Sequence, residues 1–233
     1  MNVNHSNGGV VKIERSLDIV FCMGFTQTPA LYSEKFANFL LSIKQEVEKE
    51  INGYSTTLKR LRVKIINFST YSCTPFAINE SPFFTLVGDG QNHFNQMMDF
   101  ATSPCYEDYD GHGTNGLEAL DIAMRSPTLK INGENERYKK VIVVLTDAGA
   151  KILGQTNCDG YPQNAPECVE RMVDWWNANC KNSYIVFATP TDEVWQSFNA
   201  NEHCFRFVIN DFFNYANVFD EEMKKLLVFI ANV

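Results

Sequence analysis

Polar side chains able to bind a cation follow two apolar segments of the chain. The first segment, Asp18–Met23, leads into a loop that contains Thr26 and Thr28. The second, Val141–Thr146, leads directly to Asp147. Hydroxyl and carboxylate oxygens are the hard ligands that Mg²⁺ prefers. If the two segments are neighbouring parallel strands, these side chains meet at the carboxyl edge of the sheet, where open α/β sheets bind ligands.

A glycine-rich acidic loop, residues 107–114, holds a second group of candidate ligands. Asp108 and Asp110 are followed there by His112. Two carboxylates beside an imidazole favour a transition metal, whereas a solvated loop histidine is the simpler interpretation. Together with Asp147, these side chains would supply the site of a metal-dependent hydrolase.

Short motifs and cysteines add little to that enzyme hypothesis. The chain contains no GxSxG, GxxxxGK[ST], HExxH or GxGxxG motif. Among its seven cysteines, Cys158, Cys168 and Cys180 are spaced too widely for a CxxC-type zinc site. Without an export signal, reduced thiols are expected, and a Cys158–Cys168 disulfide is the alternative.

Apolar and amphipathic segments alternate along the chain. The run Val141–Leu145 is rich in β-branched residues and is typical of a central parallel strand covered on both faces. The alternation predicts an α/β fold, with a doubly wound, mostly parallel central sheet and helices on both faces. Leu61–Phe68 alternates in its first half, which favours a place near the sheet edge. The predicted strands are 18–23, 61–68, 83–87, 141–146, 184–188 and 205–209, and the predicted helices are 33–50, 92–101, 117–124, 167–177, 192–198 and a last one from 220.

Length and charge restrict the class of protein. The 233 residues fit one α/β domain, with residues 1–15 as a flexible leader and residues 16–233 as the domain. A net charge of −8 disfavours nucleic acid or an anionic membrane as a partner. No apolar run reaches the ~18–20 residues of a membrane span, and the chain does not start like a signal peptide. These features predict a cytoplasmic protein.

Three segments resemble, in order and spacing, the metal-site segments of the von Willebrand factor A (VWA) domain. They are Asp18–Thr28, Gly113–Leu120 and Val141–Asp147. The resemblance is strongest to a bacterial intracellular-type subgroup and covers nearly all of residues 16–233, so it implies the VWA version of the Rossmann-like fold. The features shared with that subgroup are Asn115–Leu120, Thr146–Ala148, Asp174–Trp176, and Phe187–Pro190 with Trp195.

The resemblance also implies a metal site. The VWA metal-ion-dependent adhesion site falls on Thr26, Thr28, Thr114 and Asp147 as ligands of Mg²⁺, whose shell a partner's carboxylate completes. The first-loop aspartate of the family falls on Gly24, which carries no carboxylate. The site is therefore degenerate, and Mg²⁺ binding is expected to be weak or absent. Gly24→Asp would tighten that binding if the new side chain fits.

Two interpretations of this degenerate site stay open. In the first, Asp108 or Asp110 acts as an accessory ligand and compensates for the missing carboxylate. In the second, the site is vestigial, and its threonines and Asp147 form hydrogen bonds with the loop backbone.

The function that the resemblance implies is that of a non-enzymatic scaffold or adaptor, which binds a protein partner where the strands end. Similar intracellular bacterial domains work beside AAA-type ATPases or in kinase–phosphatase systems, so these are the expected partners. Phe25, Gln27 and His112 are the expected partner contacts. An exposed aromatic such as Phe25 can anchor an interface, whereas a Phe25 ring that folds back onto the core is the alternative. A structural subunit of a larger assembly with no metal function, and the metal-dependent hydrolase, are the alternatives.

Overall fold

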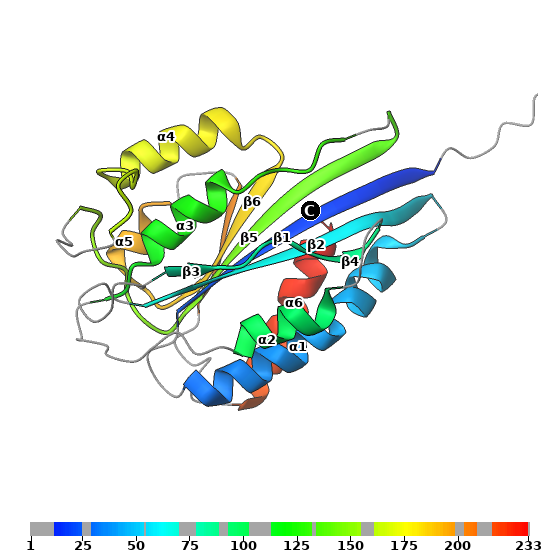
Figure 1. The fold of residues 1–233 in the computed structure, drawn as a ribbon, viewed down its shortest axis with the longest axis horizontal. Helices are drawn as coiled ribbons and strands as arrows, with labels where there is room; N and C mark the ends of the chain where they lie inside the picture. Colours follow the sequence, from blue (N-terminus) through cyan, green and yellow to red (C-terminus); the bar gives the residue numbers. More distant parts are fainter. Residues whose placement is uncertain are drawn as a thin grey trace, which may run out of the picture.

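The computed structural model describes residues 12–24, 29–53, 55–69, 78–88, 93–102, 113–131, 134–154, 161–198, 203–208 and 216–232. Within these segments, seven strands form one sheet and six helices pack against it (Figure 1). None of the helices in the described part of the chain is long and apolar enough to cross a lipid bilayer.

The sheet is mostly parallel, as the alternating pattern predicts. Its strand order is β3-β2-β1-β5-β6-β7, and β4 also pairs with β2. Only β3 and β4 run antiparallel to their neighbour among the described strands. Four of the predicted strands, 18–23, 61–68, 141–146 and 184–188, lie in adjacent strands of this one sheet. The strands are β1 (Ile13–Gly24), β2 (Thr56–Phe68), β3 (Ile78–Glu80), β4 (Phe84–Val87), β5 (Glu136–Thr146), β6 (Ser183–Thr189) and β7 (Cys204–Val208).

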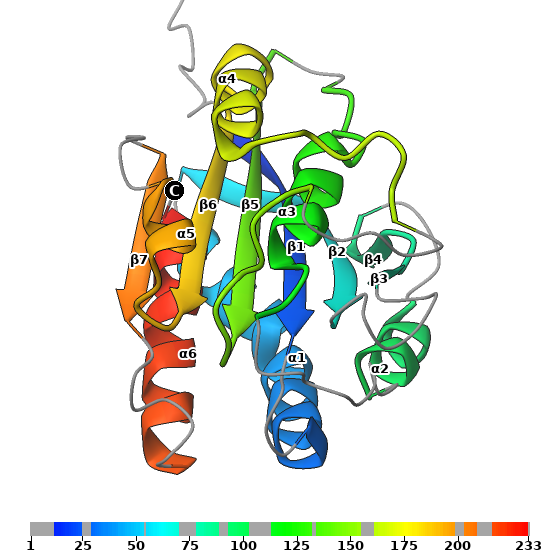
Figure 2. The same ribbon diagram turned by 90° about the vertical axis from the view of Figure 1, so that its left-hand side faces the viewer.

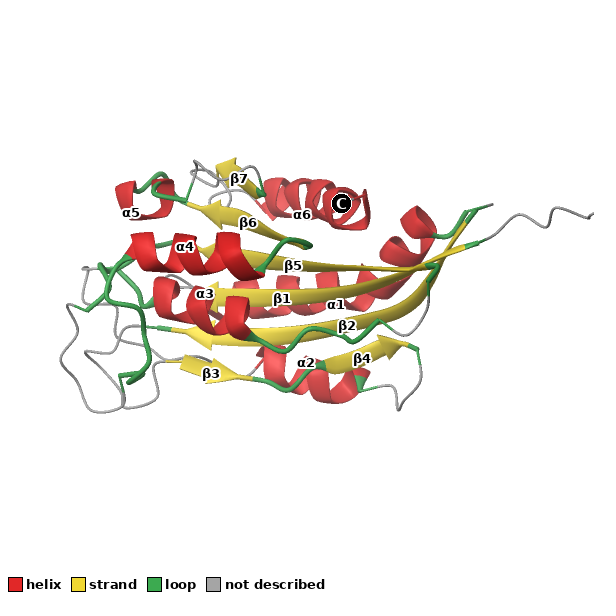
Figure 3. Cartoon of the chain, turned by 90° about the horizontal axis from the view of Figure 1, so that it is seen from above, coloured by secondary structure: helices red, strands yellow, loops and turns green. Residues whose placement is uncertain are grey.

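Helices cover both faces of the sheet, which confirms the predicted α/β class (Figures 2 and 3). One layer contains α1, α2 and α6, and the opposite layer contains α3, α4 and α5. The helices are α1 (Pro29–Ile51), α2 (Phe94–Thr102), α3 (Gly116–Arg125), α4 (Val169–Asn179), α5 (Glu193–Gln196) and α6 (Ala216–Asn232).

The central strand β1 shows why its sequence is apolar without alternation. Successive side chains of a strand point to opposite faces. Ile19 and Phe21 belong to the core on the α1 side, whereas Val20 and Cys22 belong to the core on the α3 side. Phe21 meets Phe36 of α1 edge to face, with 5.0 Å between the ring centroids, a geometry that aromatic pairs prefer. Both faces are therefore dry and need apolar residues.

The structure places β2 near the edge of the sheet, as predicted. It is the second strand in the order, between β1 and the short strands β3 and β4. Polar side chains of β2 also have partners on the neighbouring strands. Arg62 donates from Nε and Nη2 to the two carboxylate oxygens of the buried Asp18, at 2.8 and 2.6 Å, and Tyr138 also donates to Asp18, at 2.9 Å. The polar positions of β2 thus reflect ion pairing within the sheet as well as its place near the edge.

Several element boundaries also differ from the predicted ones. β1 begins at Ile13, inside the segment 1–15 expected to be a leader, because residues 13–15 pair with β2 and residues 14–15 also pair with β5. β3 was not predicted, since its three residues carry no apolar pattern. The last helix begins at Ala216, four residues before the expected start.

Candidate functional site

The ends of β1, β2 and β5 meet at one edge of the sheet, the end toward which the strand arrows point in Figure 3. Gly24 at the end of β1 pairs in register with Thr146 at the end of β5. We call this edge the carboxyl rim and define it by Gly24, Phe68, residues 113–116 and residues 146–154. The predicted meeting of the two apolar segments at one edge is confirmed.

Thr114 lies where the loop before α3 meets the loop after β5. It forms a parallel bridge with Ala150, in which Thr114 N donates to the Gly149 carbonyl at 2.9 Å and Lys151 N donates to the Thr114 carbonyl at 2.8 Å. The buried Thr114 hydroxyl also donates to the Gly149 carbonyl, at 3.2 Å. For this threonine, the geometry matches the vestigial interpretation, in which the hydroxyl binds loop backbone.

The space beside Gly24 is filled by an aromatic ring. In the register of β1 and β2, Met23 pairs with Asn67, so Phe68 follows beside Gly24. A Cβ added at Gly24 would lie 2.2 Å from Phe68 Cε2, far inside van der Waals contact. Phe68 is 1% exposed and is part of the core on the α3 side. The family's first-loop carboxylate therefore has no room here, and the described residues of the rim do not fit the Mg²⁺ site that the resemblance implies.

The structure leaves most of the predicted site residues untested. Phe25, Thr26, Gln27, Thr28, Asp108, Asp110 and His112 lie outside the described residues. Asp147 is half-buried at the rim. Within the described segments, no three or more histidine, cysteine, aspartate or glutamate side chains are grouped so that they could hold a metal ion. Cys22, Cys168, Cys180 and Cys204 are free thiols, and Cys158 lies outside the described part.

A second feature of the rim is the packing of its loops against α5. Trp195 is fully buried, and its indole Nε1 donates to the Ala148 carbonyl at 3.4 Å. Its ring lies over Gly116, where an added Cβ would be 2.5 Å from Trp195 Cη2. Asp192 caps α5 by accepting from Val194 N at 2.9 Å. The loops of the rim are thus held in place by close backbone approach at glycine and by a buried tryptophan.

Next to the rim, the structure reveals a buried carboxylate that the sequence interpretation missed. Glu118, in the first turn of α3, is 1% exposed. Its Oε1 accepts from Asn115 Nδ2 at 3.1 Å and from the Tyr161 hydroxyl at 2.8 Å, while its Oε2 has no hydrogen-bond partner among the described residues. Burial raises the pKa of Glu118, and the hydrogen bonds from Tyr161 and Asn115 and the charge of Lys151 oppose that rise only in part.

Further hydrogen bonds fix the C-terminal end of α3 and the segment after β5 that carries Tyr161. At the far end of α3, the buried Lys140 donates from Nζ to the carbonyls of Met124 at 3.1 Å and of Ser126 at 2.9 Å. At the near end, the Tyr161 hydroxyl accepts from Gly154 N at 3.3 Å. The three-residue spacing of Asn115 and Glu118 at a helix start resembles a capping box. That spacing is the one local signal in the sequence by which this carboxylate could have been found.

One large apolar side chain of the rim points into solvent. Ala150 and Leu153 are buried in the core on the α3 side, whereas Ile152 between them is 54% exposed. A single exposed isoleucine is common on protein surfaces. At the end of the sheet where open α/β folds bind their ligands, however, it is a candidate anchor for a partner.

Comparison with known proteins supports the fold. No family model and no curated protein sequence match the chain. Among solved structures, the chain is similar to the pilus adhesin SpaC from Lactobacillus rhamnosus GG, with a TM-score of 0.53, 11% identity and 94% of the chain covered. SpaC in its open conformation gives a TM-score of 0.52 and 10% identity. At this identity the likeness shows the fold alone.

The chain spans only 31% of the length of SpaC. Proximal thread matrix protein 1 from the mussel byssus is also similar in structure, with a TM-score of 0.45, 14% identity, and 95% of this chain and 48% of that chain covered. That score is too low to carry an argument. The structural likeness thus places the chain in the α/β class shared with one part of SpaC.

Proposed function

We propose that the protein is a non-enzymatic interaction module of the VWA type, which binds a protein partner at its carboxyl rim without a bridging metal ion. The order and spacing of the three VWA-like segments support the family. The structural likeness to part of an adhesin supports an interaction role over catalysis. AAA-type ATPases and kinase–phosphatase systems remain the first partners to test.

The observation that carries this proposal is the ring of Phe68 beside Gly24. In the VWA site, a metal ion links the domain to a carboxylate of the partner. Here the position of the first carboxylate is filled by a buried aromatic side chain. An apolar contact at the rim, centred on the exposed Ile152, is the alternative means of holding a partner.

A matched pair of variants tests the surface. Leu41 on α1 is 52% exposed, nearly as much as Ile152, but lies on the opposite helix layer. Proteins captured by the wild-type chain are purified, and their Kd values are measured for wild type, Ile152→Glu and Leu41→Glu. We expect Ile152→Glu to raise Kd by about tenfold or more, as for an interface anchor, and Leu41→Glu to leave it unchanged. Equal effects of the two variants, or an effect of Leu41→Glu alone, would place the interface elsewhere.

A further inference from the structure

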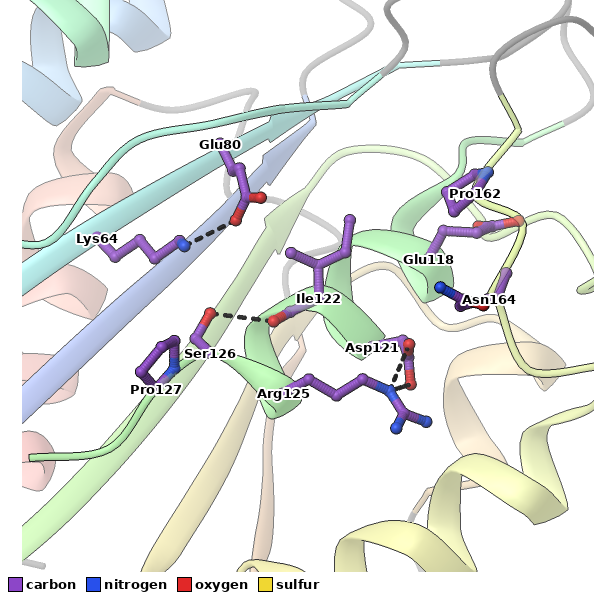
Figure 4. A pocket seen from close by; sticks show the side chains of 11 residues that line it. Lys64, Glu80, Glu118, Asp121, Ile122, Arg125, Ser126, Pro127, Pro162 and Asn164 are labelled. Atoms are coloured by element: carbon purple, nitrogen blue, oxygen red, sulfur yellow. Dashed lines mark hydrogen bonds and ion pairs between the residues drawn. The ribbon is translucent and has the colours of Figure 1, made fainter.

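A pocket with a volume of about 370 Å³ lies beside the carboxyl rim, along one face of α3 (Figure 4). Glu118 and Ile122 lie on this face, one helical turn apart. Figure 4 shows Lys64 at one end of the pocket and Pro162 and Asn164 at the other, with Ile122 between the two ends. The pocket is therefore a groove between the edge of the sheet, α3 and the segment 161–165.

Most of the charge in this pocket is already paired. Lys64 Nζ lies 2.7 Å from Glu80 Oε2, and Arg125 Nε donates to both carboxylate oxygens of Asp121, at 2.9 Å each. Glu118 is different. Within the part of the chain that the structure describes, its Oε1 accepts only from neutral groups and its Oε2 has no hydrogen-bond partner. A buried acceptor without a donor costs about 1–3 kcal/mol, and more when it is charged. The pocket thus contains one carboxylate oxygen that lacks the hydrogen bond its position demands.

We propose that this pocket receives one basic side chain of a protein partner, with the cationic group on Glu118 and the aliphatic stem along Ile122 and Pro162. This inference rests on the proposed function in one respect: the basic side chain is taken to come from the protein partner. Guanidinium and ammonium groups are pure donors, so either group supplies what Oε2 lacks. Three carboxylates against two cationic side chains line the pocket, which favours a cation over an anion.

The size of the pocket and its walls favour arginine. Ligand sites range from roughly 300 to 1,000 Å³, so this pocket suits one side chain. Long basic side chains bury their methylene stems on apolar surface while the charged head finds a polar partner. The planar fork of a guanidinium also matches the geometry of a carboxylate. Since Glu118 is 1% exposed, entry requires an outward shift of the segment 161–165, whose residues are all half-buried or exposed.

The pocket can be tested without knowing the partner. The probe is N-acetyl-L-arginine amide, and the control compound is N-acetyl-L-citrulline amide, which has the same shape and no charge. Both are titrated into the full chain labelled with ¹³C at the glutamate carboxyl groups. We expect the Glu118 carboxyl resonance to shift with the arginine probe and not with the citrulline control. We expect Glu118→Gln to bind the arginine probe at least about tenfold more weakly.

Glu50→Gln is the matched control variant, since Glu50 is an exposed carboxylate on α1, on the other face of the sheet and outside the pocket. It should retain binding of the probe. Equal binding of the citrulline compound, undiminished binding by Glu118→Gln, or no binding at all would overturn the proposal, the last outcome leaving an ordered water as the donor to Oε2. None of these results bears on the Ile152 experiment, so the pocket and the rim interface can fail separately.

Discussion

Glu118 is a carboxyl group whose pKa depends on its burial in the folded protein. Burial raises its pKa above the ordinary value of 4.5, so the folded protein holds this proton more tightly than the unfolded chain does. The free energy of unfolding therefore falls as the pH rises through the pKa of the folded state. Asp121 follows the same rule, because burial raises its pKa as well, against the charge of Arg125.

Glu118→Gln should remove this part of the pH dependence. An amide oxygen still accepts from Tyr161 and Asn115, and no charge is buried. Compared with wild type, the variant should gain stability as the pH rises above about 4.5, the ordinary glutamate value. Urea unfolding at a series of pH values measures the difference, with Glu50→Gln at an exposed position of α1 as control. A difference that is independent of pH, or equal in the two variants, would show that Glu118 titrates normally.

The ends of β1 and β2 form a matched pair, in which glycine on one strand makes room for an aromatic ring on the other. Gly24→Asp, which the family resemblance favours as a route to tighter Mg²⁺ binding, should fail because its Cβ would lie 2.2 Å from Phe68. We expect a loss of about 1–3 kcal/mol in stability, as for other overpacked cores, and no gain in Mg²⁺ affinity. Thermal unfolding and calorimetric titration with Mg²⁺ measure the two quantities.

Removing the Phe68 ring tests whether a clash with the side chain at position 24 causes the expected loss of stability. Phe68→Ala alone should cost about 3–5 kcal/mol, because it leaves a cavity in the core on the α3 side. In the double variant Gly24→Asp/Phe68→Ala, the total loss should be smaller than the sum of the two single losses, since the clash is gone. Additive losses would mean that the two positions do not share one space.

Strands of the sheet were predictable from the sequence where burial on both faces requires apolar residues throughout. The run Val141–Leu145 and the segment 184–188 could be assigned to adjacent parallel strands because each is apolar throughout. β3 could not be predicted, since its three residues form a strand only by pairing with residues 66–68 of β2. The place of β2 near the sheet edge was predictable from its alternation, but the ion pair of Arg62 with the buried Asp18 was not, because it joins two strands far apart in the sequence.

At the scale of the whole molecule, the carboxyl rim was predictable but its chemistry was not. Parallel strands place their ends together, so the meeting of Gly24 and Thr146 follows from the fold. The ring of Phe68 beside Gly24 depends on the register of two strands more than thirty residues apart. The partner of Glu118 is also distant in the sequence, because Tyr161 lies 43 residues along the chain. Contacts of this kind leave no local pattern.

The metal dependence of partner binding tests most directly the claim that the rim works without a bridging ion. Kd for a partner whose binding is weakened by Ile152→Glu is measured for the wild-type chain in excess Mg²⁺ and again in EDTA. We predict the same Kd in both, because Phe68 fills the place of the family's first-loop carboxylate beside Gly24. Loss of binding in EDTA, with full recovery when Mg²⁺ is restored, would contradict this and show that the rim holds its partner through an ion after all.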